Sequence, residues 1–497
     1  MRMVRMAATL VGVAWVAALG LAAGVRPASD EKVLQKVLLK VHQAAGTVLL
    51  AGEDVSYADL LANEDFVKAC AEAKVPYLGG PMLGGVTGEG VRVWMRTCRP
   101  AEVAVVVSAD GQERRFGPVA STAESELAAV VPVTGLKPGT TYVYRVLIDG
   151  APAPIPEHAR IVTAPAEDRP VRIAFSSCPH TGGLNNRALL DAVRARRPAA
   201  FLCNGDIVSH DKGGHRGAQR LQYLRRDFFP AWQDFACTVP FYATWDDHDY
   251  YGDNISGLMR CTPEVRDRNL AVFKASWNNP SYGFPASGHE GSRGGVFLRT
   301  RIGAADVIMT DNRYFRGADN YEDGRKSFLG KAQTAWLKAQ LADCKGPFII
   351  LSCGTQWRDK GKDSWDKDKG YRRERDELFQ FIEDRNIKGV LLISGDAHGA
   401  SGIKVPRPSG FCFYEFEVAN LGASGDHTKV AERHPDLVLY CTGKEITGNH
   451  VGEFTIDPTP PDPTVTFNLV RPDGQSDYEL TLKRSQLTPR PAKAGHE

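Results

Sequence analysis

The sequence lacks a surplus of charge of either sign. It has 61 basic and 59 acidic residues among 497, and no basic block or stripe interrupts this balance. Proteins that bind nucleic acid usually concentrate lysine and arginine on one face. The composition therefore gives no reason to expect a nucleic-acid partner, and a net charge of +2 says nothing about the charge of a substrate.

Internal repeats, low-complexity tracts and a dense cysteine framework are also missing. The ten cysteines are scattered along the chain, whereas small disulfide-stapled domains place theirs close together. No disulfide pairing is assigned for this reason. A chain of this length is expected to form two or more domains, one of them large enough for an α/β core.

One long apolar run is present, at the start of the chain. Arg2 and Arg5 precede AATLVGVAWVAALGLAAG, which is the order of charge and hydrophobicity in a secretory signal. The run is long for a signal peptide and short for a transmembrane helix. We therefore expect residues 1–25 to be a signal peptide or an N-terminal anchor. The protein would then be periplasmic, secreted or held at a membrane by this segment.

Two further regions precede the main part of the chain. Residues 26–80 show helical spacing of apolar residues and are predicted to be a helical lead-in, ended by the glycine- and proline-rich GGPMLGG. From 81 to 165, short and evenly spaced runs such as VRVWMRT and AEVAVVV predict a β-sandwich. Within it, VTGLKPGTTYVYRV resembles the end of a fibronectin type III domain, for which we expect a supporting role.

Strands and helices alternate from 170 to 485. RIAFSSC, AAFLCNGD and VPFYATWDD are typical of buried strands, and NRALLDAVRARRP and ERDELFQFIEDRN of amphipathic helices. This alternation predicts an α/β fold in which helices cover a sheet. The tail TVTFNLVRPDGQSDYELTLKR alternates with period two and is predicted to form a hairpin.

Four of the predicted strands end in residues of the kinds that bind metals. These residues are Cys178, His180, Asp206, Asp247, His248, Asp396 and His398. Ligands of α/β proteins collect at the carboxyl ends of strands, so four such endings predict a binuclear metal site. Two cations would also remove the repulsion among the crowded acids of WDDHDYYGDN.

The motifs SSCPH, NGDIVSHD, WDDHDYYGDN and SGDAHGA carry these residues. Together they resemble the metallophosphoesterase superfamily and, within it, the PhoD-like alkaline phosphatases and phosphodiesterases. ASWNNPSYG, MTDNRYFRG and FLGKAQTAWL are similar to stretches of that family in the same order. The resemblance implies a two-sheet sandwich flanked by helices and preceded by a fibronectin type III-like domain.

The same resemblance assigns roles within the site. It implies six metal ligands: Cys178, Asp206, Asp247, Asn254, Asp396 and His398. Asp206 would bridge both metals, His248 would be catalytic, and Asp249 would orient His248. Asp253 competes with Asn254, and His180 and Asp246 stay open as ligands or as supports of ligands.

One position departs from the family pattern. Ser209 stands three residues after Asp206, where the family commonly has a tyrosine that binds iron. His210 or Asp211 could take its place, or the metal could differ. The family pairing is ferric iron with calcium, and the thiolate of Cys178 suits the softer or ferric ion. Zinc and manganese remain alternatives.

The chemistry implied is hydrolysis of phosphate esters by a metal-bound hydroxide, with His248 either contacting a phosphate oxygen or protonating the leaving alkoxide. Arg313, Arg316 and Arg358 are candidates to bind the phosphate. We expect an exported alkaline phosphatase that acts on small monoesters. A phosphodiesterase or phospholipase D-like hydrolase of phospholipid or polymer diesters is the first alternative. A non-catalytic surface binding protein with a degenerate site is the second.

Overall fold

The structure is a computed structural model that describes residues 28–109, 111–284, 294–317, 326–358 and 364–489. The predicted signal or anchor at 1–25 lies outside these residues. No helix within the described part of the chain is both long and apolar enough to cross a membrane.

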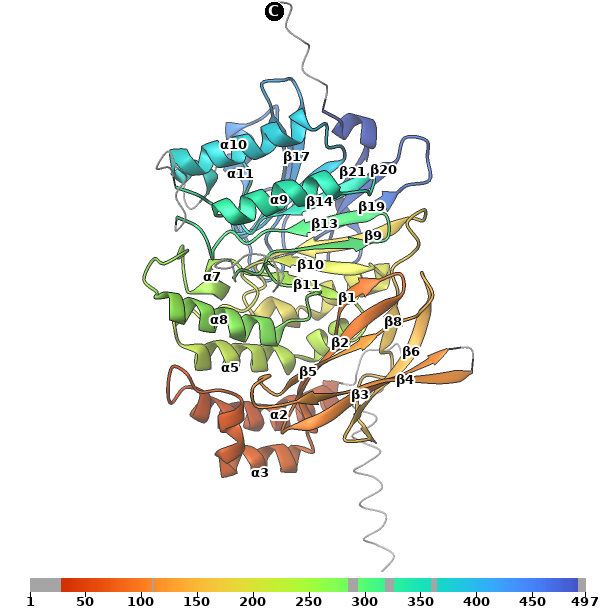
Figure 1. Cartoon of the computed structure of the whole chain (residues 1–497), viewed down its shortest axis with the longest axis vertical. Coiled ribbons are helices and arrows are strands. Elements are labelled where there is room, and N and C mark those ends of the chain that lie inside the picture. Colours follow the sequence, from red (N-terminus) through yellow and green to blue (C-terminus); the bar gives the residue numbers. More distant parts are fainter. Residues whose placement is uncertain (1–27, 110, 285–293, 318–325, 359–363, 490–497) are drawn as a thin grey trace, which may run out of the picture.

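The described part of the chain begins with helices at one end of the molecule (Figure 1). They are α2 (Ala28–Leu49), the 3-10 helix η1 (Ala58–Ala62) and α3 (Glu64–Ala73). Leu38, Val41, Ala45 and Leu49 recur at helical spacing and are buried in one apolar cluster with residues of α3. Asn63 caps α3 by accepting a hydrogen bond from the amide of Phe66.

Eight strands follow and form two small sheets. The first sheet holds β1 (Tyr77–Thr87), β2 (Gly90–Thr97) and β5 (Ala128–Val133). The second holds β4 (Gln112–Ser121), β3 (Ala101–Ala109), β6 (Thr141–Ile148) and β7 (Ala151–Pro152), and β8 (Arg160–Val162) also pairs with β6. A β domain is thus present in the region where evenly spaced strands were predicted.

The interpretation of GGPMLGG as a break is wrong, because this segment lies within β1. Its glycines permit close approach to the rest of the chain. A Cβ on Gly84 would lie 2.1 Å from the carbonyl oxygen of Asn278, so any side chain there would displace the contact. Tertiary packing, which local sequence does not reveal, explains why glycine stands in a strand here.

A six-stranded sheet comes next, in the order β11-β10-β9-β19-β20-β21. Its parallel part is β9 (Val171–Ser176), β10 (Ala200–Asn204) and β11 (Phe241–Thr244), and β19 (Val451–Asp457) pairs antiparallel with β9. The predicted C-terminal hairpin is present as β20 (Thr464–Val470) and β21 (Ser476–Lys483).

A seven-stranded sheet lies beside it, in the order β12-β13-β14-β15-β17-β16-β18. Its members are β12 (Leu298–Ile302), β13 (Ala305–Met309), β14 (Phe348–Ser352), β15 (Val390–Ser394), β16 (Ala400–Pro406), β17 (Cys412–Val418) and β18 (Val438–Cys441). Phe416 of β17 packs 5.2 Å from the ring of Phe454 of β19, so the two sheets meet through buried aromatic side chains.

Strand alternation decides what each face covers. Ile173 and Phe175 of β9 join a cluster with residues of the seven-stranded sheet, whereas Ala174 between them faces a cluster with α4 and α6. In the seven-stranded sheet Ile350 faces the six-stranded sheet, and Ile349 and Leu351 face a third cluster with α9 and α10. Apolar residues therefore fill both faces of both sheets, as expected of covered strands.

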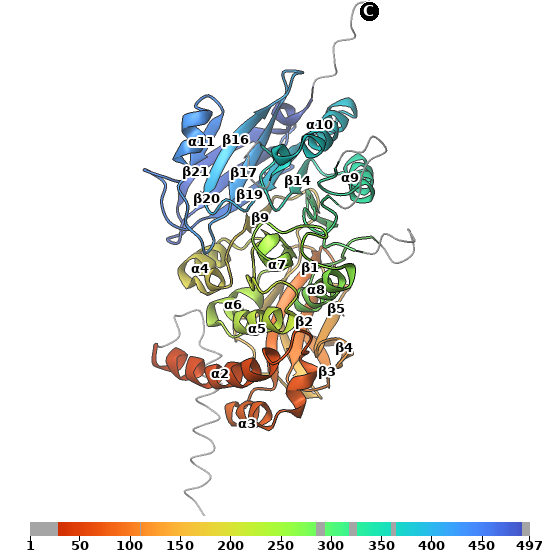
Figure 2. The same ribbon diagram turned by 90° about the vertical axis from the view of Figure 1, so that its left-hand side faces the viewer.

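The helices cover the outer faces (Figures 1 and 2). The six-stranded sheet is covered by α4 (Arg187–Arg196), α5 (Arg216–Asp227), α6 (Pro230–Ala236) and α8 (Pro263–Ser276). The seven-stranded sheet is covered by α9 (Lys331–Asp343) and α10 (Lys369–Asp384). The short helices η2 (Gly182–Asn185), α7 (Asp247–Tyr250), η3 (Trp365–Lys367), α11 (Thr428–Arg433) and η4 (Arg484–Leu487) lie in connections. The mixed α/β fold predicted from the sequence is confirmed.

Candidate metal centre

Four strand ends bring the predicted ligands together. The parallel strands β9, β10 and β11 end at Ser176, Asn204 and Thr244, and β15 of the other sheet ends at Ser394. The residues that follow within three positions are Cys178, Asp206, Asp247 and Asp396. Parallel neighbours end at the same edge, which is why residues far apart in sequence meet there.

Two groups of potential ligands share Asp206. One group consists of Cys178, His180, Asp206 and His398, and the other of Asp206, Asp246, Asp247 and Asp396. Within each group, one ligand atom per residue lies within 4.8 Å of every other. A third group joins Asp206 and Asp247 to His248. The geometry thus offers two neighbouring positions for cations with the Asp206 carboxylate between them.

The loops that carry these residues are fixed to one another by their backbones. The amides of Cys178, His180 and Thr181 donate to the carbonyls of Gly205, Asp206 and Ile207, at 3.1, 3.0 and 2.8 Å. Cys178 and Asp206 both have positive φ angles, of 55° and 53°. Non-glycine residues rarely adopt such angles and keep them only where the surroundings impose them. The ligand geometry is therefore built into rigid loops.

Gly205 shows why the N-G-D motif needs a glycine. Its φ is +111°, and a Cβ there would lie 2.4 Å from the Cβ of Asp246. The absence of a side chain lets the loop after β10 touch the loop after β11. This contact is what places Asp206 beside Asp246 and Asp247.

The electrostatics of the protein alone disfavour charge at this point. Burial, together with the neighbouring Asp247 and Asp246, raises the pKa of Asp206 well above its usual range. Burial and the charge of Asp206 likewise raise the pKa of the Cys178 thiol. Bound cations reverse such shifts, because they favour the ionised forms of their ligands.

The residues present fit a metal centre by two tests. Thiol, imidazole and carboxylate are the donor types that transition metals and calcium take. The Oδ2 atom of Asp246 is buried and has no hydrogen-bond partner among the described residues. A buried carboxylate oxygen without a partner is costly, and a cation would satisfy it.

Arg313 is the counter-ion of the crowded acids. Its Nε donates to Oδ1 of Asp246, and its Nη2 lies 3.8 Å from Oδ1 of Asp247. Burial raises the pKa of Asp246 to about 7 in spite of Arg313. For Asp247, Arg313 and His248 outweigh burial, and its pKa falls below the usual range. Asn312 adds a hydrogen bond of 3.0 Å to Asp246.

His248 is held by Asp211, which the sequence predicts as a possible metal ligand in place of the family tyrosine. Its Nδ1 lies 2.6 Å from Oδ1 of Asp211. Asp249, predicted to orient His248, instead accepts hydrogen bonds from the amides of Ile207 and Val208 at 2.9 and 2.7 Å. The predicted role of Asp249 is therefore indirect: its carboxylate ties the loop after β10 to α7, the helix that carries His248.

The open candidates separate clearly. The amide of Asn254 donates to Oδ2 of Asp247 at 2.5 Å, whereas Asp253 is exposed in the turn. His210 is buried with Nε2 3.2 Å from the carbonyl of Asp249. None of the donor groups among the described residues contains His210, Asp211 or Asp253. The suggestion that His210 or Asp211 replaces the family tyrosine is therefore not supported by their positions.

Comparison with known proteins agrees with this geometry. Residues 210–467, more than half of the chain, match the family described as PhoD-like phosphatase. The chain belongs to the PhoD-like phosphatase family. The resemblance inferred from the motifs is thereby confirmed, although Cys178, His180 and Asp206 precede the matched residues. Residues 75–165 match a domain of unknown function, DUF7800.

Individual proteins that resemble this chain share little sequence identity with it. Alkaline phosphatase D of Bacillus subtilis (strain 168) is 23% identical over 187 residues, which cover 32% of this chain and 31% of that protein. The match thus spans about a third of the curated relative. A solved structure of PhoD superposes with a TM-score of 0.63 at 16% identity, over 85% of this chain and 93% of that one.

A purple acid phosphatase, PPD1 from yellow lupin (Lupinus luteus) seeds, superposes with a TM-score of 0.57 at 12% identity, over 81% of this chain and 74% of that one. At identities this low, the two superpositions establish a shared fold only. The family membership itself rests on residues 210–467.

Two of the three predicted phosphate-binding arginines have other partners in this PhoD-like chain. Arg358 is buried with Nη2 2.5 Å from Oε2 of Glu417. Arg316 is also buried, donates from Nε to the carbonyl of Asn312 at 2.7 Å, and packs on the ring of Phe328. Both guanidinium groups lie in buried contacts, so the structure adds no support for the phosphate-binding role predicted for them. Arg313 faces the acids instead.

A buried polar network behind the Asp396 loop was missed. Gln356 donates to the carbonyl of Gly395 at 2.7 Å, and Nε2 of His427 lies 2.9 Å from the carbonyl of Ala397. Glu417 joins Gln356 to Arg358. His427 is 6% exposed and belongs to this buried network. The signal was the alternation in FYEFEV, which puts two glutamates on one buried face of β17.

Proposed function

We propose that the protein is a metal-dependent phosphatase that hydrolyses phosphate monoesters at a binuclear centre. The observation that carries the proposal is the pair of donor groups that share Asp206. Two cations bound in this way would lower the pKa of a bound water and neutralise charge on the phosphate. The family pairs ferric iron with calcium, and zinc or manganese are the alternatives for this chain.

His248 supplies the proton for the leaving group. Burial lowers its pKa, but the carboxylates of Asp247 and Asp211 outweigh burial and raise the pKa above its usual value. The protonated form therefore persists to higher pH. Asp211 holds Nδ1, which leaves Nε2 on the opposite side of the ring to reach a leaving oxygen. The side chain is 20% exposed, so a substrate can approach it.

The acidic residues position and polarise without taking part in bond making. Asp206 and Asp247 would hold the cations, and Arg313 stabilises the ionised form of Asp247. Asp249 fixes α7 against the loop after β10 and so sets the position of His248. The charge of the phosphate would be offset by the cations and by His248.

Three finer points belong to the same proposal. Strands β1–β8 form a supporting domain of fibronectin type III type, residues 170–485 form the catalytic domain as a two-sheet sandwich, and the N-terminal segment directs export. The close contact of Gly84 with Asn278 supports a fixed attachment of the β domain to the catalytic part.

Rates on two substrates test the monoester assignment. The full chain, purified without chelator, is assayed on nitrophenyl phosphate and on bis-nitrophenyl phosphate. We expect a higher kcat/KM on the monoester, because its dianion gains more from two cations. A higher kcat/KM on the diester would make the protein a phosphodiesterase. No metal-dependent rate on either substrate would contradict the enzyme proposal.

A further inference from the structure

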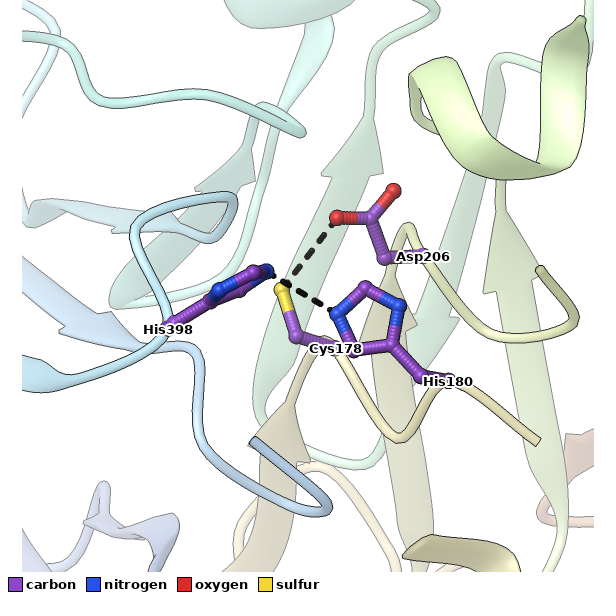
Figure 3. A group of neighbouring side chains, drawn as sticks. All are labelled: Cys178, His180, Asp206 and His398. Carbon is purple, nitrogen blue, oxygen red and sulfur yellow. Dashed lines mark hydrogen bonds between the residues drawn. The ribbon is translucent and has the colours of Figure 1, made fainter. Parts of the chain in front are cut away.

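We propose that His180 is a metal ligand that replaces the missing family tyrosine, and that Ser209 positions it. The resulting site has the donors Cys178 Sγ, His180 Nε2, Asp206 carboxylate and His398 Nε2 (Figure 3). Such a set suits a divalent ion of the zinc type rather than ferric iron. The inference deepens the proposed function and rests on it for the existence of a metal centre.

The two imidazoles face the same point. Their Nε2 atoms are 2.9 Å apart, and the rings meet nearly edge to face at 4.8 Å between centroids. Two nitrogen atoms on one tetrahedral zinc ion, each bonded at about 2.0–2.1 Å, lie roughly 3.3 Å apart. The separation in the structure is close to this value, so a small outward movement of either ring would admit the ion.

The other two donors complete the set. The Sγ atom of Cys178 lies 3.4 Å from Oδ2 of Asp206. Sulfur and oxygen on one tetrahedral zinc ion are roughly 3.5 Å apart, given bonds of about 2.3 and 2.0 Å. Figure 3 shows the sulfur and the two Nε2 atoms converging from two loops, those after β9 and β15, while Asp206 lies on a third loop, after β10.

Ser209 decides which nitrogen of His180 is available. Its Oγ lies 2.7 Å from Nδ1 of His180. When Nδ1 carries the hydrogen and donates it to Ser209, the lone pair is on Nε2, the atom that faces His398. Metal-binding histidines commonly donate their second nitrogen to an oxygen in this way. Serine here acts through histidine instead of binding the ion as a phenolate would.

The position of His180 is imposed by its loop. Its φ is 44°, and that of His398 is 61°. The amide of His180 donates to the carbonyl of Asp206, which ties it to the loop that carries Ser209. The His180 side chain is thus held at an unfavourable backbone angle and tied to the neighbouring loop of Asp206, as an assembled metal site requires.

Divalent cobalt tests this assignment without any substrate. Chelated protein is titrated with Co²⁺, and the thiolate-to-cobalt charge-transfer band reports binding beside Cys178 alone; C178S identifies the band by removing it. We expect S209A to weaken this binding by about 10- to 100-fold, H180A to weaken it further, and S209T to retain it. The exposed His434 provides the control, so H434A keeps wild-type affinity.

Circular dichroism of the metal-free variants separates misfolding from ligand loss, and S209A removes only one hydroxyl. Unchanged cobalt affinity and an unchanged band in both H180A and S209A would overturn the inference. Failure of the proposed function appears differently, as wild-type protein that binds cobalt normally but hydrolyses no phosphate ester.

Discussion

The Nδ1 atom of His248 lies 2.6 Å from Oδ1 of Asp211. Asp211 is about half exposed and His248 is more buried, so the carboxylate reaches in from the rim of the site. This pair links the loop after β10 to the first turn of α7. It fixes both the direction and the charge of the proposed proton donor.

Loss of either partner should reduce turnover through the leaving group. We expect H248Q to lower kcat by about 10²–10⁴-fold, and D211N by less, with the larger effect on alkyl phosphates that have poor leaving groups. Because Asp211 helps to raise the pKa of His248, D211N should also move the alkaline fall of kcat to lower pH. The pH profile of kcat on alkyl and nitrophenyl esters measures both effects. An unchanged profile in D211N would contradict the role of Asp211.

Asp253 and Asn254 should differ sharply on substitution. Asn254 is tied to Asp247 through its backbone and adopts a φ of 57°, while Asp253 is exposed. Because the family resemblance makes the Asn254 side chain a metal ligand, we expect N254A to lose metal from the Asp247 side and to lose activity, and D253A to keep both. Elemental analysis of the two variants beside the wild type makes the comparison. Loss of metal in D253A with full retention in N254A would reverse the ligand assignment.

Arg313 should be essential for stability. Removing one partner of a buried ion pair costs about 3–5 kcal/mol, so R313M should unfold at much lower urea than the wild type. The double variant R313M/D246N should recover part of the loss, because neither charge then lies unpaired. The exposed pair Arg145–Glu113 gives a matched control, in which R145M changes the free energy of unfolding by less than about 1 kcal/mol. Additive effects of R313M and D246N would contradict a direct pairing.

Glu417 should contribute to acid sensitivity. Burial raises its pKa, but Arg358 and His427 outweigh burial and lower it below the usual 4.5. A lowered folded-state pKa stabilises the protein above pH 4.5, and this stability is lost as pH falls below that value toward the folded-state pKa. Urea unfolding of chelated protein between pH 7 and pH 3 should therefore show a shallower acid loss in E417Q than in the wild type. Parallel curves for the two proteins would contradict this account.

Asp206 should destabilise the metal-free protein. Its folded-state pKa is raised, so its ionised form costs stability that grows as pH rises above 3.8. Chelated D206N is therefore expected to be at least as stable as chelated wild type at pH 7. Added metal should stabilise the wild type more than D206N, in proportion to binding. Thermal unfolding with and without metal tests both statements, and a chelated D206N that is clearly less stable would refute them.

Local patterns predicted most elements of the fold. The alternation of strands and helices from Val171 onward, and the period-two tail that forms β20 and β21, follow from periodicity alone. The misassigned GGPMLGG shows the limit of this approach. Its Gly84 packs against Asn278, almost two hundred positions away, and no local rule reveals such a contact.

The site was predictable as a location but less so as a network. Ligand types at four strand ends placed Cys178, Asp206, Asp247 and Asp396 near one edge. Side-chain directions decided the rest. The sequence alone does not show which nearby acid holds His248. In the structure Asp211 reaches His248, whereas Asp249 accepts hydrogen bonds from backbone amides.

The most direct test of the account compares wild type and D206N, each chelated, then reconstituted with metal and assayed on nitrophenyl phosphate. The account predicts that wild-type protein binds two metal ions per chain and regains activity, whereas D206N loses bound metal and at least about 10²-fold in kcat/KM. Equal activity of the two proteins, with or without metal, would contradict it.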